Sequence, residues 1–267
     1  MDPTYQQLAA MIDHSLLHPT LTDKDLAEGC RIAALYGVAS VCIKPYAVKM
    51  AVDLLRGTGV KVGAVVGFPH GSAAIESKRY ETELACNDGA EEIDMVINIG
   101  KALGGQWEYV EADIRAVCRE AHSHSAQVKV ILETDYLTQG GAGLDADTLK
   151  KKLCELSERA GCDWVKTSSG FGFVKQKNGS YTYQGATEHD ILLMRASVSD
   201  RVQVKAAGGV RDLEGLIRVF ELGATRCGAT ATAAMLDEYR RRESIKATSG
   251  VSGSIKPQEN TLGSGGY

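Results

Sequence analysis

The 267-residue sequence has no apolar run near the ~20 residues that a membrane span needs, and its N-terminus has no basic segment followed by an apolar one. Lysine and arginine (30) are outnumbered by aspartate and glutamate (34), so no basic surplus attracts nucleic acid or an anionic membrane. We therefore expect a cytoplasmic protein that binds neither nucleic acid nor membranes, and any anion site must be local.

The sequence also lacks closely spaced cysteine pairs. The seven cysteines are scattered, odd in number and never spaced as Cys-x-x-Cys, which is typical of reduced core residues. The six histidines form no ligand pattern, so we expect neither a metal nor a cofactor. No Gly-x-Gly-x-x-Gly motif follows an early strand, which argues against a dinucleotide-binding Rossmann domain.

What the sequence does contain is a repeated alternation of apolar strands and amphipathic helices. Strands are expected at 11–17, 39–44, 60–68, 92–98, 127–134, 163–170, 201–207 and 225–229. Helices are expected at 5–10, 22–37, 48–55, 75–87, 108–122, 147–159, from 187 onward, at 213–222 and, as a short segment, around 235–239. Four of these helices end in a glycine followed by a small residue, a common C-cap pattern.

Eight such units in about 230 residues fit a single (β/α)8 TIM barrel better than an open sheet. We predict that this barrel covers residues 1–243. Residues 244–267 are poor in apolar side chains and are predicted to form a flexible polar tail.

Lys166 is the most informative residue of the sequence, because it interrupts the apolar strand pattern of residues 163–170. Alternation places Lys166 on the face of Trp164 and Ser168, where a strand usually buries apolar groups. Burial and a neighbouring positive charge both lower a lysine pKa and leave a neutral amine that can attack a carbonyl to form a Schiff base. The alternative is an edge-strand lysine whose amine reaches water.

Two other strands carry a charge among apolar residues. Asp94 interrupts the run from Ile93 to Ile97, and Lys205 alternates with Val202 and Val204. If all three strands end at one barrel mouth, Lys205 would lower the pKa of Lys166, while Asp94 would balance charge and pass protons. A purely structural Asp–Lys pair across the barrel is the alternative.

Glycines at the ends of the last strands indicate an anion site. Gly208 and Gly209 follow the seventh strand, Thr230 follows the eighth, and Gly170 follows the lysine strand. Barrels frequently bind phosphate at this place through free backbone N–H groups. A glycine pair by itself more often marks only a tight turn. Its position after the seventh strand is what favours a phosphate site, and with it a small phosphorylated carbonyl compound as substrate.

Several of these segments together resemble deoxyribose-phosphate aldolases, which are class I aldolases on a (β/α)8 barrel. The similar segments are 68–71, 92–98, 165–171, 185–187, 205–211 and 226–228, and the resemblance spans roughly residues 12–236. It implies reversible cleavage of 2-deoxy-D-ribose 5-phosphate to D-glyceraldehyde 3-phosphate and acetaldehyde, with these compounds as the protein's small-molecule partners.

The resemblance also implies roles for individual residues. Lys166 would form the Schiff base, with Asp94 and Lys205 as proton donor and acceptor. The substrate would be bound by Asp13, Ser15, Gly170, Gly208, Gly209 and Thr230. The final residue, Tyr267, would reach the mouth as a proton relay.

Other interpretations stay open at this point. The chain could be another class I aldolase for a small phosphorylated sugar, or a non-catalytic barrel that binds sugar phosphates. A metal-dependent aldolase would need clustered ligands. Residues 174–183 form a longer loop than the resemblance requires, and we expect a solvated insertion there. The sequence leaves homo-oligomer formation open.

Overall fold

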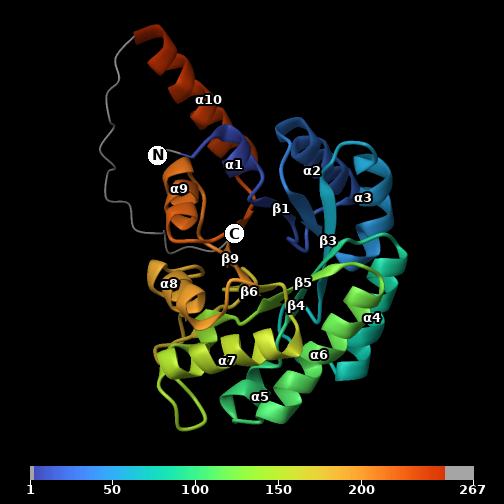
Figure 1. Ribbon diagram of the computed structural model, residues 1–267, viewed down its shortest axis with the longest axis vertical. Coiled ribbons are helices and arrows are strands. Elements are labelled where there is room, and N and C mark those ends of the chain that lie inside the picture. Colours follow the sequence, from blue (N-terminus) through green and yellow to red (C-terminus); the bar gives the residue numbers. More distant parts are fainter. Residues whose placement is uncertain (1–2, 250–267) are drawn as a thin grey trace.

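The computed structural model describes residues 3–249 and has the predicted closed barrel of eight parallel strands at its centre (Figure 1). Around the barrel the strands follow the order β1-β10-β9-β6-β5-β4-β3-β2. They are β1 (Ile12–Leu16), β2 (Ser40–Ile43), β3 (Lys61–Val66), β4 (Glu92–Val96), β5 (Gln127–Ile131), β6 (Trp164–Lys166), β9 (Gln203–Ala207) and β10 (Arg226–Ala229). The predicted fold class is therefore confirmed.

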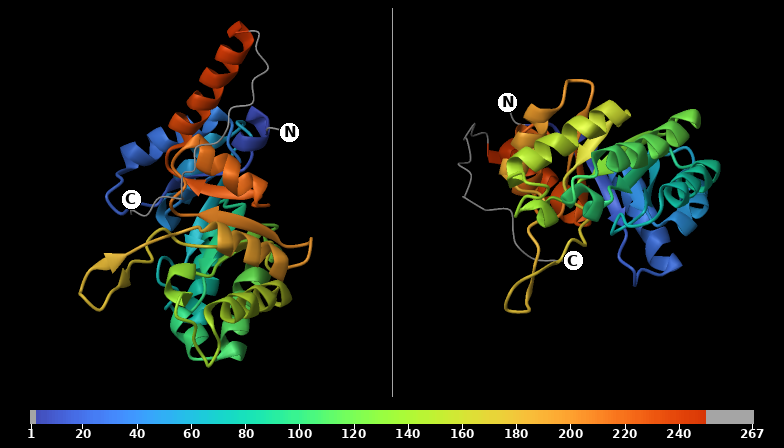
Figure 2. Two further views of the ribbon diagram at one scale, coloured as in Figure 1. Left: turned by 90° about the vertical axis from the view of Figure 1, so that its left-hand side faces the viewer. Right: turned by 90° about the horizontal axis from the view of Figure 1, so that it is seen from below.

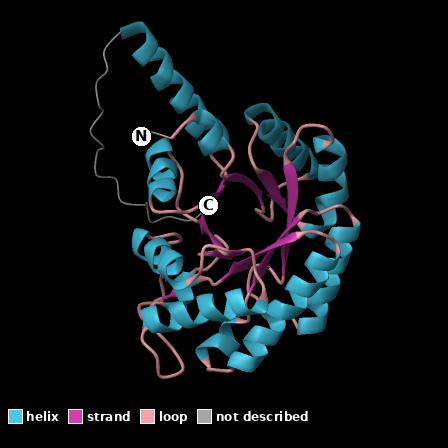
Figure 3. Ribbon diagram, in the orientation of Figure 1, coloured by secondary structure: helices cyan, strands magenta, loops and turns pink. Residues whose placement is uncertain are grey.

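Helices surround the strands (Figure 3). They are α1 (Tyr5–Ala9), α2 (Asp23–Tyr36), α3 (Val48–Leu55), α4 (Ile75–Asn87), α5 (Ile99–Leu103), α6 (Trp107–Ser123), α7 (Ala146–Ala160), α8 (Glu188–Ser197), α9 (Leu213–Glu221) and α10 (Thr232–Ser249). Two short 3₁₀ helices, η1 (Pro45–Ala47) and η2 (Thr134–Leu137), follow β2 and β5. The short helices η1, α5 and η2 were not expected from the sequence.

Local sequence signals set where the helices begin and end. Thr22 forms a capping box with Asp25 at the start of α2, and Gly37 ends that helix in the left-handed conformation (φ 62°). Gly161 ends α7 in the same way, with φ 102°. Glycine is favoured there because it has no Cβ to clash in this conformation.

Strand alternation divides the molecule into an apolar layer and a polar barrel interior. Val128, Val130, Val165 and Val204 are fully buried members of the apolar core, together with residues from the surrounding helices. The residues between them on the strands point the other way, into the barrel. Lys129 is one of these and is only 1% exposed. The interior of the barrel therefore receives charged side chains instead of the usual branched apolar ones.

The helix α10 is much longer than the short helix expected from the sequence, and it extends beyond the barrel (Figure 2). Residues 244–249, predicted as the start of the tail, are helical. Charged side chains one turn apart support this helix, since Glu238 pairs with Arg241 at 2.7 Å and with Arg242 at 2.6 Å. The helix runs past the predicted boundary at residue 243, and residues 250–267 of the predicted tail lie outside the described part of the chain.

The segment 174–183, expected to be a solvated loop, contains the two-stranded hairpin β7 (Val174–Lys175) and β8 (Tyr181–Thr182). Figure 2 shows it extending away from the barrel. Among the helices of residues 3–249, none has both the length and the apolar composition needed to cross a membrane.

We predict that Gly71, in the loop after β3, tolerates no side chain. Its φ is 66°, and a Cβ there would lie 1.8 Å from the carbonyl oxygen of Ile97. Gly71→Ala should lower the free energy of unfolding by about 2 kcal/mol or more, measured by urea denaturation. Gly57→Ala is the matched control, because Gly57 also has a positive φ, of 79°, but a Cβ added to it would meet no other atom within 4 Å. Equal losses in the two variants would contradict the steric explanation.

Candidate active site

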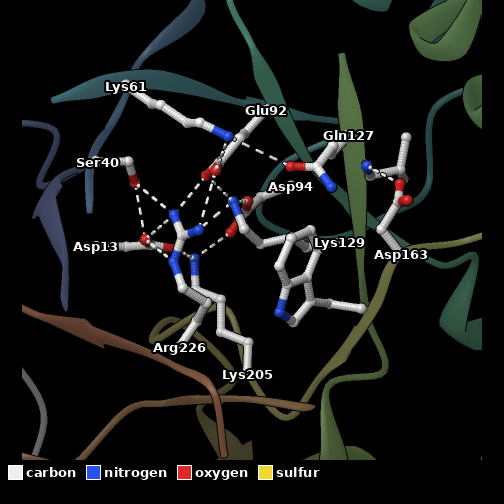
Figure 4. A network of polar contacts seen from close by, with 12 residues as sticks. Asp13, Ser40, Lys61, Glu92, Asp94, Gln127, Lys129, Asp163, Lys205 and Arg226 are labelled. Atoms are coloured by element: carbon white, nitrogen blue, oxygen red, sulfur yellow. Dashed lines mark hydrogen bonds and ion pairs between the residues drawn. The ribbon is translucent and has the colours of Figure 1, made fainter. Parts of the chain in front are cut away.

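Seven charged side chains meet inside the barrel, and Figure 4 labels all of them except Lys166. The carboxylates are Asp13, Glu92 and Asp94, and the bases are Lys129, Lys166, Lys205 and Arg226. Each is at most 8% exposed, and they come from six strands, β1, β4, β5, β6, β9 and β10. Because buried charges are costly unless they are paired, their mutual contacts decide whether this interior can exist.

Asp94 joins the three lysines. Its Oδ2 atom accepts hydrogen bonds from the Nζ atoms of both Lys166 (2.7 Å) and Lys205 (2.6 Å). Its other oxygen, Oδ1, accepts from Lys129 at 3.0 Å. The Nζ atoms of two lysines thus share one carboxylate oxygen, so these nitrogens lie close together. The predicted grouping of Asp94, Lys166 and Lys205 is what the structure contains.

Arg226 forms the second centre of the cluster. Its guanidinium donates to Asp13 Oδ1 at 2.7 Å and to both oxygens of Glu92 at 3.0 and 2.6 Å. Ser40 donates a further hydrogen bond to Asp13 at 2.7 Å. The other oxygen of Asp13 lies 2.5 Å from the Lys205 Nζ atom. Asp13 thus connects the Arg226 centre to the Lys205 side chain.

The charges set different proton affinities for the three lysines. Burial lowers the pKa of Lys166, and the Lys205 charge lowers it further against the opposing effect of Asp94. Burial also disfavours the charged form of Lys205, but Asp13 and Asp94 outweigh it and raise that pKa well above the usual range. In Lys129 the carboxylates likewise outweigh burial and raise the pKa.

The number of charges in the cluster also indicates that Lys166 is the lysine that loses its proton. Four bases against three carboxylates leave one surplus positive charge in the barrel interior if every group is ionised. Lys61 also approaches Glu92, at 3.7 Å, but its side chain is 42% exposed and its charge is solvated. Lys166 is the lysine of the cluster whose pKa is lowered, so loss of its proton would neutralise the interior.

A small cleft opens above this cluster, with an empty volume of about 240 Å³ that includes its opening to solvent. Both Lys166 and Lys205 line it, as do Asp13 and Ser15. The remaining lining residues are Leu17, Cys42, Ser169, Ala207 and Gly228. Four of the predicted site residues therefore share one cleft. Asp94, which is fully buried, lies beneath it and reaches it only through the two lysines.

The predicted phosphate-binding residues follow the strand ends that border this cleft. Gly170, Gly208 and Gly209 all have positive φ angles, of 93°, 91° and 84°. Gly170 directly follows the lining residue Ser169, and Gly208 directly follows Ala207. Thr230 is exposed and lies just before α10. These positions suit an anion at the rim of the cleft, whereas Tyr267 lies outside the described residues.

Glu133 is a buried acid that the sequence analysis missed. It follows β5 in a left-handed conformation (φ 57°), and its carboxylate accepts the Ser169 backbone N–H at 3.0 Å. The neighbouring Leu132 N–H donates to the carbonyl oxygen of Lys166 at 2.9 Å. Burial raises the pKa of Glu133 to about 7, although the bonds from Ser169 oppose the shift. Glu133 therefore supports the chain segment that follows Lys166.

Other members of the cluster were also missed, although Lys129 carried a readable signal. It stands between Val128 and Val130, the same alternation that singled out Lys205. Glu92 and Arg226 begin their strands, where a charge is ordinarily read as exposed. Within residues 3–249, no group of three or more His, Cys, Asp or Glu side chains is arranged to hold a metal ion.

A family model and several relatives point to the same family. The model of the DeoC/LacD family aldolases matches residues 7–240. A deoxyribose-phosphate aldolase of Rhodopirellula baltica is 46% identical over 246 residues, covering 92% of this chain and 95% of that protein. One from Clostridium perfringens is 45% identical over 232 residues, covering 87% and 95%. The tetrameric structure of deoxyribose phosphate aldolase from Aeropyrum pernix is 29% identical, with a TM-score of 0.76 and coverage of 89% and 92%.

We predict that Glu133 makes stability depend on pH. Its folded pKa of about 7 exceeds its ordinary value of 4.5, so the folded state holds this proton more tightly and loses stability as pH rises through that window. Relative to the parent, Glu133→Gln should gain up to roughly 3 kcal/mol in free energy of unfolding between about pH 5 and pH 8. Urea denaturation at both pH values measures this. A stability difference that does not change with pH would contradict the assignment.

Proposed function

The chain belongs to the DeoC/LacD family of aldolases, and we propose that it is a deoxyribose-phosphate aldolase whose Schiff base forms on Lys166. This aldehyde-lyase cleaves 2-deoxy-D-ribose 5-phosphate to D-glyceraldehyde 3-phosphate and acetaldehyde. One observation carries the residue assignment. Lys166 opens onto the cleft with a lowered pKa and shares a carboxylate oxygen with a second lysine.

The chemistry begins on the neutral Lys166 amine. The amine attacks C1 of the open-chain aldehyde, and the resulting carbinolamine takes up one proton and loses water, which gives an iminium ion. As the C3 hydroxyl loses its proton, the C2–C3 bond breaks and its electron pair moves towards the iminium nitrogen. This releases D-glyceraldehyde 3-phosphate and leaves an enamine. Protonation at C2 and hydrolysis of the resulting iminium release acetaldehyde and regenerate the amine.

Asp94 and Lys205 are proposed to move the protons. The Lys205 ammonium stays charged because Asp13 and Asp94 outweigh its burial, and it can therefore donate a proton within the cleft. Three lysines outweigh the burial of Asp94 and keep its pKa well below the usual range, so it is the permanent anion of the group. Asp94 therefore passes protons between the two lysines that it contacts and stays ionised itself.

The substrate-binding residues are proposed on their positions around the cleft. Ser15 lies on its wall, and Gly170, Gly208, Gly209 and Thr230 lie at the rim, where backbone N–H groups suit a phosphate. Asp13 also lines the cleft, but both of its oxygens face cations. Its role is therefore to hold the Lys205 charge more than to bind the sugar.

The oligomeric state and the cellular compartment of the protein are proposed from other observations. The relative from Aeropyrum pernix is tetrameric, which supports a homo-oligomer for this chain. All seven cysteines are buried and unbridged, which supports a reducing compartment such as the cytoplasm. A proton relay through Tyr267 stays a prediction from the family resemblance.

Trapping with borohydride tests the nucleophile. Addition of 2-deoxy-D-ribose 5-phosphate and borohydride to the parent should leave a reduced two-carbon adduct on Lys166, located by peptide mass spectrometry. Lys166→Ala should lose both the adduct and all measurable cleavage while its circular dichroism spectrum is unchanged. An adduct on another lysine, or cleavage by the variant, would refute the assignment, and a chelator should change neither result.

Removing the charge of Lys205 tests its proposed role in proton transfer. Lys205→Leu should lower kcat by at least ~10²-fold, because it removes a proton donor and the positive charge that lowers the Lys166 pKa. The pH at which the remaining activity rises should be higher than in the parent, because the pKa of Lys166 is no longer lowered by the Lys205 charge. Lys61→Leu is the control, since Lys61 is half-exposed, contacts Glu92 and does not line the cleft. A parent-like rate and pH profile in Lys205→Leu would contradict the proton role.

A further inference from the structure

The inserted hairpin β7–β8 is an ordered part of the molecule. Val174 pairs with Thr182 and Lys175 with Tyr181 in antiparallel register. Its turn is closed by the Gln176 N–H, which donates to the Ser180 carbonyl oxygen at 2.7 Å. The first strand of the hairpin begins four residues after Gly170, so its first end starts near the chain segment that contains Lys166.

Both ends of the hairpin are fixed to the 3₁₀ helix η2. The Tyr136 hydroxyl donates to the carbonyl oxygen of Phe173 at the first end, at 3.3 Å. At the second end, the Asp135 carboxylate accepts the backbone N–H groups of Gln184 at 2.7 Å and Gly185 at 3.0 Å. Asp135 is only 5% exposed, so these bonds are shielded from water.

The second end packs directly on the glycine turn after β9. The Ala186 N–H donates to the carbonyl oxygen of Gly208 at 3.1 Å. A Cβ at Gly185, where φ is 73°, would lie 2.7 Å from the carbonyl carbon and oxygen of Gly208. The hairpin and the proposed phosphate-binding turn are therefore in contact through backbone atoms.

This packing brings the side chain of Tyr183 to the same turn. Tyr183 is 6% exposed, and its ring centroid lies 5.6 Å from that of Phe173. A Cβ at Gly208 would lie 1.8 Å from the Tyr183 hydroxyl oxygen, so that oxygen touches the Gly208 α-carbon. By contrast, Tyr181 on the same hairpin is 61% exposed.

We propose that Tyr183 is a specificity-determining residue that donates a hydrogen bond to the substrate phosphate held at Gly208 and Gly209. This inference rests on the proposed function. A phenol is a hydrogen-bond donor at neutral pH, and a phosphate oxygen is a strong charged acceptor. The glycine turn supplies backbone N–H groups, and the hairpin adds this side-chain donor beside them. The insertion thereby favours phosphorylated over unphosphorylated substrates.

Conservative substitutions on the hairpin test the inference. Tyr183→Phe keeps the ring packing and removes only the hydroxyl, and Tyr181→Phe is the matched control on the exposed position. KM and kcat are measured in the parent and both variants with 2-deoxy-D-ribose 5-phosphate and with free 2-deoxyribose. Binding of inorganic phosphate to all three proteins is measured by calorimetry, which requires no turnover.

Tyr183→Phe should raise KM for the phosphorylated sugar by about 10-fold, change KM for free 2-deoxyribose far less, and weaken phosphate binding by a similar factor. Tyr181→Phe should match the parent in every measurement. Parent-like phosphate binding and KM values in Tyr183→Phe would overturn the inference while leaving the aldolase assignment intact. A parent that fails to cleave the phosphorylated sugar would overturn the proposed function, and the calorimetry alone would then decide for or against the phosphate contact.

Discussion

The barrel interior depends on pairing seven buried charges in one enclosed space. Removing even one ion from water costs several kcal/mol, so such a cluster persists only if every carboxylate faces cations and every cation faces carboxylates. Asp94 and Asp13 satisfy this by contacting several bases each. The arrangement nevertheless leaves one base too many, and that surplus favours a neutral amine on Lys166. Reactivity in this account follows from the electrostatics of the interior.

The fold supplies this arrangement through strand alternation. Valines on one face of each strand pack against the helices, which leaves the opposite face free to carry charges into the barrel. The charges occupy different positions along the strands. Arg226 and Glu92, which contact each other, are the first residues of β10 and β4, whereas the two lysines on the Asp94 oxygen line the cleft. Glu133 and the hairpin then fix the chain at the rim, where the substrate phosphate is proposed to bind.

Sequence patterns predicted the parts of this structure that depend on local signals. The eight strands, most helices and the grouping of Asp94, Lys166 and Lys205 follow from alternation and glycine caps. The missed parts depend on distant contacts. Glu133 matters because it reaches Ser169, 36 residues away, and Arg226 because it reaches Glu92, 134 residues away. The hairpin was missed because its strands have two residues each, and α10 was predicted too short because its support comes from charge pairs and not from apolar periodicity.

The protonation state of the three buried lysines tests this account most directly. Heteronuclear NMR of the lysine side chains, assigned through Lys→Arg or Lys→Met variants, would follow each Cε and Nζ signal as pH is raised. Lys166 should titrate below its ordinary pKa of 10.5, while Lys129 and Lys205 should stay charged above that pH. Titration of Lys166 together with the exposed lysines, or loss of a proton from Lys205 before Lys166, would contradict the charge balance on which the proposed mechanism rests.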